Sequence, residues 1–271
     1  MGSLRVISVA FFIVFPFLTA SGGDPWRPSA GAGEAGMGYA CVMKSSFWSS
    51  FHNQANLAFS NLSAGFNYEN RFGIKELGTR SAGVSIPYGK ASIGAVYSYF
   101  GYPDFKRHSA GLACGLKLSD KIAAGAQVDY YSERTFGEYS NHEAVTFEAG
   151  LLLMPDENIR VGIHLFNPVP NSLRKSFLPS RLRVGAGMNL GAALFAGAEA
   201  EMSTGGSMIV RMGFEYETMK KLWIRGGFST DNTAFSFGLG YLMNFVRMDL
   251  GFVTHEKLGV TSSASLIFEI H

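Results

Sequence analysis

The final residues of the chain, 258–270, alternate between apolar side chains and small or polar ones. Val260 and Leu266 belong to one set of alternate positions, and Thr261 and Ser265 belong to the other. Successive side chains of a strand point to opposite faces of its sheet, so this strand has one apolar and one polar face. The alternation recurs back to about residue 62, always with an apolar side that is compatible with lipid. Such a pattern is typical of a transmembrane β-barrel.

The alternation predicts fourteen antiparallel strands within residues 61–271. They run at about 61–69, 79–87, 90–100, 108–118, 121–132, 143–154, 158–167, 180–190, 193–202, 207–217, 220–230, 233–243, 245–254 and 258–270. The longest connections, at about 101–107, 133–142 and 168–179, all fall at one end of the expected barrel. Bacterial barrels have an even strand count, short periplasmic turns and longer outer loops, which agrees with this sorting.

Residues 1–21 are expected to be a signal peptide, because Arg5 precedes the apolar run 6–18 and small residues follow at 19–21. After them no stretch approaches the roughly 20 apolar residues that a spanning helix needs. The chain is nevertheless 47% hydrophobic and only 16% charged. An exported chain of this kind satisfies its backbone by closing a sheet, so the predicted location is the bacterial outer membrane. The net charge of +2 gives no indication of nucleic-acid binding.

Residues 22–60 do not alternate and precede the first strand. They hold a glycine- and alanine-rich stretch, 31–38, which lacks the βαβ unit of a dinucleotide site, and then an aromatic stretch, 47–58. A segment this short is not a domain, and a fourteen-stranded barrel is wide enough to need filling. We therefore expect residues 22–60 to be a hatch inside the lumen of the barrel formed by residues 61–271.

The hatch carries a resemblance to a known family. The run Ala35 to Gly38 (Ala-Gly-Met-Gly), an aromatic at Trp48, and Asn53-Gln54-Ala55 followed by Asn56-Leu57-Ala58 are similar to FadL-type barrels, with Gln54 where the family has proline. These barrels include long-chain fatty-acid transporters and the PorV-type proteins of type IX secretion. The resemblance implies fourteen strands, an N-terminal hatch and, in the transporters, a lateral opening for hydrophobic ligands.

Two groups of candidate site residues follow. The hatch or ligand residues are Trp48, Phe51, His52, Asn53, Ala55 and Asn56. The candidate lateral opening lies at the end of the third strand, at Tyr99, Phe100, Gly101, Tyr102 and Pro103. Gly and Pro would permit a break in the wall there, although the start of an ordinary loop explains them too.

Charged residues on the inward faces form a third group, the lumen charge ladder. Its members are Glu148, Arg160, Arg181, Arg183, Glu199, Glu201, Arg211 and Glu215. In one interpretation they are cross-strand ion pairs that fill the lumen and anchor the hatch. In the other they line a polar conduit or bind an anion.

Aromatic residues near strand ends are interpreted as interface girdles. They are Tyr97, Tyr99, Phe100, Tyr102, Tyr130, Tyr131, Trp223 and Tyr241. Cys41 and Cys114 are expected to remain unpaired, with Cys114 on an apolar strand face.

The first functional hypothesis is passive passage of a small hydrophobic compound, with the hatch as the gate. The alternative is a non-transporting partner barrel of a type IX secretion machinery. An enzyme is not expected, because no serine is paired with an outward histidine on neighbouring strands, and no cluster has metal-ligand spacing. No cofactor is expected, and the expected partners are outer-membrane lipid and either a hydrophobic small molecule or a secretion protein.

Overall fold

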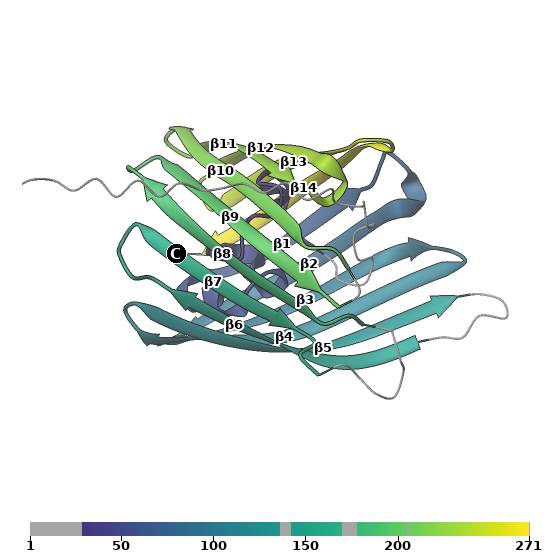
Figure 1. Ribbon diagram of the computed structural model, residues 1–271, viewed down its shortest axis with the longest axis horizontal. Helices are drawn as coiled ribbons and strands as arrows, with labels where there is room; N and C mark the ends of the chain where they lie inside the picture. The colour runs from purple at the N-terminus through teal and green to yellow at the C-terminus, as the bar shows by residue number, and fades with distance from the viewer. Residues whose placement is uncertain (1–28, 136–141, 170–177, 205, 271) are drawn as a thin grey trace, which may run out of the picture.

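A computed structural model describes residues 29–135, 142–169, 178–204 and 206–270 (Figure 1). The strands are β1 (Leu62–Asn70), β2 (Gly78–Tyr88), β3 (Ala91–Tyr102), β4 (Phe105–Ser119), β5 (Ile122–Thr135), β6 (His142–Leu153), β7 (Ile159–Phe166), β8 (Arg181–Leu190), β9 (Leu194–Ser203), β10 (Ile209–Met219), β11 (Leu222–Ser229), β12 (Ala234–Met243), β13 (Val246–His255) and β14 (Gly259–Ile270). Each strand pairs with its sequence neighbours, and β1 pairs antiparallel with β14 to close the barrel. The predicted closed, fourteen-stranded antiparallel barrel is confirmed. The expected signal peptide, 1–21, lies outside the described residues.

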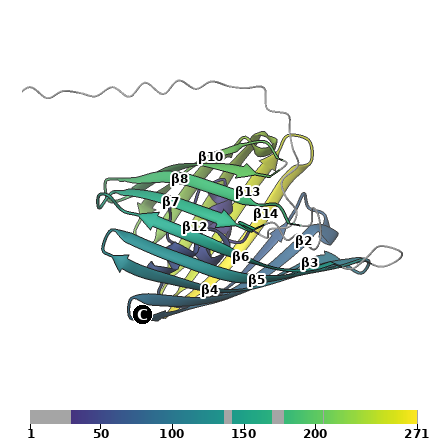
Figure 2. The same cartoon turned by 60° about the horizontal axis from the view of Figure 1, so that its bottom comes forward.

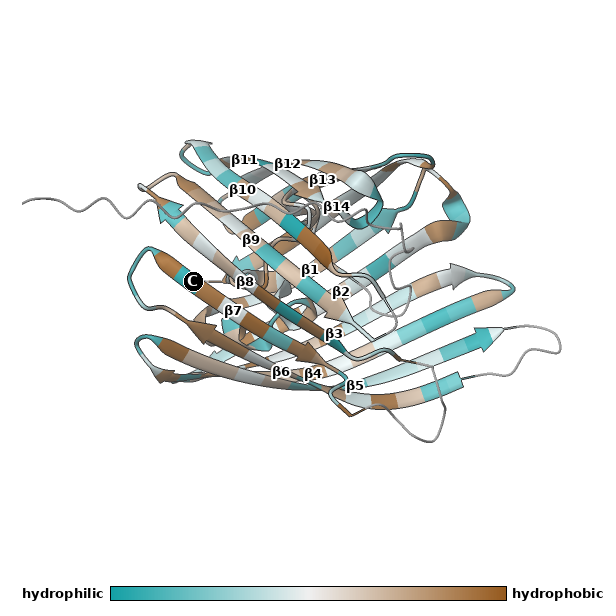
Figure 3. Ribbon diagram, in the orientation of Figure 1, coloured by the Kyte–Doolittle hydropathy of each residue, from teal (hydrophilic) through white to brown (hydrophobic). Residues whose placement is uncertain are grey.

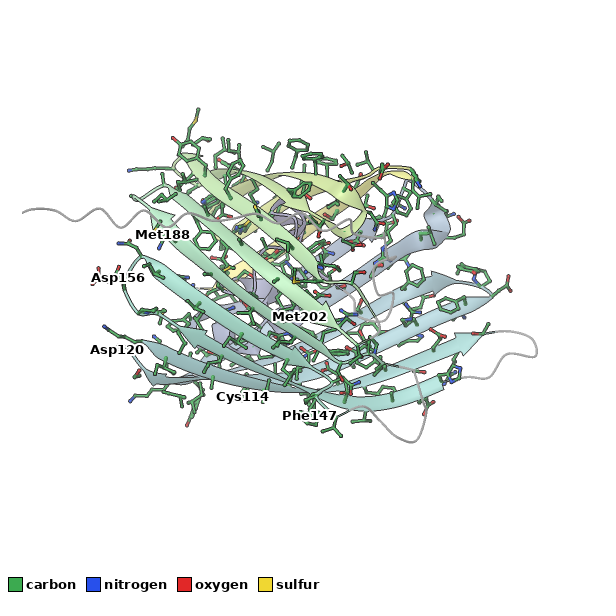
Figure 4. The ribbon with its side chains drawn as sticks, viewed as in Figure 1. Cys114, Asp120, Phe147, Asp156, Met188 and Met202 are labelled. Carbon is green, nitrogen blue, oxygen red and sulfur yellow. The ribbon has the colours of Figure 1, made fainter. Side chains whose placement is uncertain are left out.

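The two faces of each strand follow the sequence alternation. On β8, Arg181 and Arg183 are buried in the interior, whereas Val184 and Met188 are exposed on the outside. Met188 and Met202 lie on the outer wall in Figure 4, as do Phe147 and Cys114. The outer wall is therefore apolar and the inner wall polar, as a barrel in lipid requires.

Within the described part of the chain, none of the helices is both long enough and apolar enough to cross a membrane.

The wall is taller on one side. β4 and β5 have 15 and 14 residues, whereas β7 has only 8. The long connection expected at 101–107 is wrong, because Tyr102 pairs with Phe105 and only Pro103 and Asp104 form the turn. The polar residues of this region, such as Lys106, continue the strand beyond the apolar band instead of forming a loop. The ends of β3–β5 are correspondingly hydrophilic in Figure 3.

The segment before β1 lies inside the barrel, where it is drawn in purple in Figures 1 and 2. It contains α1 (Ala32–Gly36) and the 3₁₀ helices η1 (Phe47–Phe51) and η2 (Gln54–Phe59). α1 contacts β11–β14, and η2 contacts β3–β6, so the segment spans the lumen from wall to wall. Residues 29–60 are called the hatch below. Two further 3₁₀ helices, η3 (Lys75–Leu77) and η4 (Asp231–Thr233), lie in connections between strands.

Inward-facing glycines let the hatch backbone touch the wall. They form a belt across nine strands: Gly94, Gly115, Gly125, Gly150, Gly162, Gly213, Gly227, Gly238 and Gly251. A Cβ at Gly115 would lie 2.7 Å from the carbonyl oxygen of Gln54, and a Cβ at Gly125 would overlap the Gln54 backbone. Side chains at these positions would push the hatch away, so the glycine belt makes room for it.

Candidate functional site

Asn53 begins η2 and fastens the hatch to itself and to the wall. Its side-chain oxygen accepts a hydrogen bond from the Ala55 N–H at 3.1 Å, which caps the helix. Its amide nitrogen donates to the carbonyl oxygens of Val42 at 2.7 Å and of Leu151 on β6 at 3.2 Å. The Asn56 amide also donates to Val42 O, at 3.1 Å. Asn53 and Asn56 therefore hold the hatch together, and Asn53 also fastens it to β6.

Gln54 adds a contact to the wall through its side chain. Its amide donates to Glu148 Oε2 on β6 at 2.6 Å, and the same oxygen lies 2.7 Å from Nε2 of His164 on β7. All three side chains are buried. Glu148 thus belongs to a local hydrogen-bonded group with Gln54 and His164.

Glu199 on β9 is the centre of a second group. One carboxylate oxygen lies 2.6 Å from Arg183 Nη2 on β8 and 3.2 Å from Arg211 Nη1 on β10. The other oxygen accepts the backbone N–H groups of Cys41 and Val42 at 3.0 and 2.9 Å. Arg183 also donates to the carbonyl oxygen of Tyr39 at 3.0 Å. The group therefore joins three strands to the hatch.

Glu201 and Arg181 extend this group. Glu201 lies 2.9 Å from Arg211 and 4.0 Å from Arg181, and the Arg181 guanidinium lies over the Phe166 ring at 5.6 Å. Arg160, the remaining arginine of the expected ladder, forms no ion pair with any described carboxylate. The ladder is thus not one continuous row.

A third group includes a residue that the sequence did not single out. Lys44 of the hatch lies 2.8 Å from Glu215 on β10, which also lies 2.6 Å from Arg225 on β11. Arg225 and Arg247 pair with Asp249 at 2.7 and 3.1 Å. Lys44 is a cation in a segment with almost no other charge, and this was the available signal for an anchoring role.

The aromatic part of the hatch is packed against one side of the wall. Trp48 and Phe51 form a buried apolar cluster with Ala30 and Ile267 of β14. The ring nitrogen Nε2 of His52 lies 2.8 Å from the carbonyl oxygen of Ala30. His52 and Ala55 are buried, and Ala55 packs against Ala123 and Leu152, so these residues help to hold the hatch against the wall.

Two cavities open at the end of the barrel that has the longer connections. The first, about 290 Å³, lies on the inner face of β2–β4 and is lined by Leu77, Phe100, Tyr102, Phe105, Arg71, Arg107 and three small polar residues. The Phe100 and Phe105 rings meet edge to face at 6.0 Å. We call this cavity the aromatic pocket.

The second cavity, about 390 Å³, lies above the hatch, and we call it the vestibule. Gly38, Tyr39, Phe51 and His52 of the hatch line it. Its wall carries both signs of charge, at Glu69, Arg71, Arg181, Glu201, Arg211 and Asp231. Tyr39 donates to Glu69 Oε2 at 2.8 Å and so ties the hatch to β1.

The candidate lateral opening at residues 99–103 forms no gap in this structure. Tyr99 and Phe100 pair with β2 and β4, and Gly101 and Tyr102 remain paired with β4 up to the turn. Gly101 has a φ of +143°, and a Cβ there would overlap the backbone of Phe105. Glycine is required at this position for the tight β3–β4 hairpin. A lateral opening at these residues stays a prediction.

Four residues assigned to the aromatic girdle face the lumen instead. Phe100 and Tyr102 line the aromatic pocket, Tyr131 is buried against Phe166, and Trp223 lies 4.9 Å from the Arg247 guanidinium. The alternation explains this correction, because Phe100 and Tyr102 share a strand face with the inward Ser98, Tyr131 with Asp129, and Trp223 with Arg225. Tyr97, Tyr130 and Tyr241 are exposed on the outer wall.

A third hollow, about 940 Å³, lies on the outer wall over β9–β12. Phe214 and Phe237 flank Gly226 there, so the hollow faces lipid.

Cys41 is buried, and Cys114 is exposed on the outer wall; neither is in a disulfide. In the described part of the chain, no three side chains of His, Cys, Asp or Glu are grouped so that they could hold a metal ion.

Solved structures share this architecture. A FadL homologue from Pseudomonas aeruginosa superposes with a TM-score of 0.68 at 12% identity, covering 91% of this chain and 99% of that one. The toluene transporter TodX from Pseudomonas putida gives a TM-score of 0.62 at 11% identity, covering 88% of this chain and 96% of that one. The CymD monoaromatic hydrocarbon channel gives 0.68 at 11% identity, covering 90% and 98%.

At these identities the likeness is one of fold, and the chain has the fold of FadL-type barrels. No family model matches the sequence, and no curated protein does.

Proposed function

We propose that this barrel lies in the bacterial outer membrane and passes small hydrophobic compounds passively, with the hatch as its gate. The observation that carries the proposal is the aromatic pocket, which is apolar on its Leu77, Phe100 and Phe105 side and opens next to the vestibule above the hatch. The similar folds include a toluene transporter and a monoaromatic hydrocarbon channel, which support the same class of compound.

The size of the aromatic pocket indicates the size of the compound. An engineered apolar cavity of about 150 Å³ in another protein binds benzene, so the present cavity of about 290 Å³ accommodates a one-ring compound with a short substituent. Aromatic side chains on two strands would contact such a ring through their edges and faces. The Arg107 guanidinium lies 2.7 Å from the Glu133 carboxylate, so the charge that Arg107 brings to the pocket is balanced by an ion pair.

The test is uptake of radiolabelled toluene by cells whose outer membrane carries the barrel. Wild-type barrel should raise the uptake rate above that of cells without it. Ser109→Phe fills the aromatic pocket and should return uptake towards the background. Ala110→Phe, which adds the same ring to the outer face of the next residue, should leave uptake unchanged.

Unchanged uptake with the wild-type barrel contradicts the proposal. Equal loss in both variants indicates misfolding and is checked by the heat-dependent shift in electrophoretic mobility.

A further inference from the structure

Three cations lie on the outside of the wall near the end with the longer connections: Arg80 on β2, Lys106 on β4 and Arg134 on β5. Each occupies an outward position in the alternation, because Thr79, Arg107 and Glu133 beside them face the lumen. Arg80 and Arg134 are exposed, and Lys106 is half-buried. Outward cations are costly within the apolar band, so their position needs an explanation.

The strand register brings these cations together. Tyr99 on β3 lies directly opposite Arg80 on one side and His108 on the other. Lys106 lies directly opposite Arg134. Like charges directly opposite each other on neighbouring strands are destabilising, so this pair would be stabilised by an anion between them.

The three cations have no carboxylate partner among the described residues, whereas nearby inward arginines do. Arg71 lies 3.0 Å from Glu69, and Arg107 lies 2.7 Å from Glu133. Glu143, on the same outer face, is opposite Ser132 and not opposite a cation. The outer cations are therefore available to an external anion.

Tyrosines surround the cations and place them at the edge of the apolar band. The Arg80 guanidinium lies 5.9 Å from the Tyr68 ring and 5.8 Å from the Tyr99 ring. The Tyr97 hydroxyl lies 2.7 Å from Nδ1 of His108. Tyrosine on an outer barrel face is typical of the membrane–water interface. We call Tyr68, Arg80, Tyr97, Tyr99, Lys106, His108 and Arg134 the basic–tyrosine patch.

The opposite wall lacks this feature. Towards the same end of the barrel, the described outward positions of β10–β13 hold Val210, Phe228, Phe235 and Thr254. The basic–tyrosine patch on β1–β5 therefore has no counterpart among the described outward positions of β10–β13.

We propose that the basic–tyrosine patch binds the phosphate groups of a phosphorylated glycolipid in the outer leaflet. Guanidinium and ammonium groups match phosphate oxygens in charge and hydrogen-bonding geometry. The patch adjoins exposed apolar wall residues such as Val84, Leu112 and Val128, against which the acyl chains of the same lipid pack. This inference rests on the membrane location given under the proposed function, but it does not depend on transport.

The test uses native mass spectrometry of the full barrel in detergent titrated with bis-phosphorylated lipid A. The wild type should retain lipid A. The triple variant Arg80→Gln, Lys106→Gln, Arg134→Gln should bind about a hundredfold more weakly, since each cation near an anionic lipid contributes about a fivefold factor. The matched control Lys90→Gln, Lys121→Gln, Lys220→Gln removes the same charge from turns at the other end and should bind as the wild type does.

Two further arms separate the sources of the anion. Dephosphorylated lipid A should bind as weakly to the wild type as lipid A does to the triple variant. Inorganic phosphate at tenfold molar excess over lipid A should not displace the lipid. Equal binding by the two triple variants, or displacement by inorganic phosphate, overturns the proposal. Toluene uptake by the Arg80, Lys106 and Arg134 variant should be normal, so failure of transport and failure of lipid binding are distinguishable.

Discussion

A carboxylate buried in a lumen is stable only when several donors surround it, and Glu199 meets this requirement with two arginines and two backbone N–H groups. The backbone groups belong to the hatch, so the charge of one wall residue sets the position of a segment more than a hundred residues earlier in the chain. Removing that charge is expected to affect the hatch before it affects the barrel.

Glu199→Gln should destabilise the closed hatch by about 3 kcal/mol, because it leaves Arg183 as a buried charge without its main partner. The measurement is the urea dependence of Trp48 fluorescence in a background carrying Trp26→Phe and Trp223→Phe, together with the rate of proteolysis within residues 29–60. Glu256→Gln, in an exposed connection, serves as the control. Identical urea curves for Glu199→Gln and wild type would show that the Glu199 group does not anchor the hatch.

Cys41 provides a second test at a single residue. Burial raises the pKa of the Cys41 thiol to about 12, so the thiol stays protonated and unreactive at pH 8. The folded barrel should therefore incorporate an uncharged maleimide only at Cys114, and Cys41 should react only after urea is added. Mass spectrometry of peptides identifies the labelled site, with Cys41→Ser as the control. Rapid labelling of Cys41 at pH 8 would mean that the hatch opens without denaturant.

Single-residue roles were harder to predict than positions. The alternation placed Glu199, Arg183 and Arg211 on inward faces, and the structure brings these three together. It could not identify their partners in the hatch, because backbone N–H groups and Lys44 leave no periodic signal in a sequence. Glu148 was grouped with arginines by strand order, and the alternation could not show that Gln54 and His164 would lie within hydrogen-bond distance of it.

At the scale of elements, the hatch and the wall fit because the glycine belt removes side chains where η2 and α1 touch the strands. The hatch is short of regular structure, so its position depends on this fit and on the three polar groups. A larger side chain in place of a belt glycine should therefore displace the hatch by occupying the space that the hatch fills.

Gly125→Val should displace η2, since even a Cβ at this position overlaps the Gln54 backbone. The barrel should still form, because the strand gains a residue with high β-propensity. Single-channel conductance in planar bilayers should rise relative to wild type. Ala126→Val, the neighbouring outward residue, should leave the conductance unchanged. A silent Gly125→Val channel would contradict the role of the glycine belt.

The sequence predicted the strands to within a few residues because burial and lipid exposure alternate with the pleat along the whole wall. It failed at 101–107, where Gly101, Pro103 and Asp104 resemble a loop. The structure shows a two-residue turn closed by the paired residues Tyr102 and Phe105. Here the aromatic side chains of Phe100 and Phe105 face the lumen and Lys106 faces outward, so the alternation is the reverse of the pattern within the apolar band and does not reveal the strands.

For the whole molecule, a closed wall and a lumen filled by the hatch mean that passage requires the hatch to move. A disulfide between the hatch and β3 tests this requirement. A Cβ at Gly94 would lie 2.7 Å from Ser50 Oγ, which is a suitable distance for Ser50→Cys and Gly94→Cys to bond. In a background carrying Cys41→Ser and Cys114→Ser, oxidation should reduce toluene uptake to background, and reduction should restore it.

Either single cysteine variant in the same background is the control and should transport under both conditions. Undiminished uptake by the oxidised double variant would place the route elsewhere than through the hatch.

The fold is shared with a FadL homologue and two hydrocarbon channels at 10–12% identity, so few individual residues are needed to specify it. The strand alternation and strand count are sufficient, because lipid outside and polar groups inside impose the same rule on every strand. Ligand-specific residues are few by comparison, which is why a periodic pattern predicts the barrel and not the compound.

The pairing of β1 with β14 has a consequence for biogenesis. Leu62 pairs with Ile270, so the wall becomes a ring only when the last strand meets the first. The hatch immediately precedes β1 and is already enclosed in the finished ring. Because β14 is the last strand of the described chain to be synthesised, the seam with β1 is the last part of the ring that can form, and until then the strand that follows the hatch keeps a free edge.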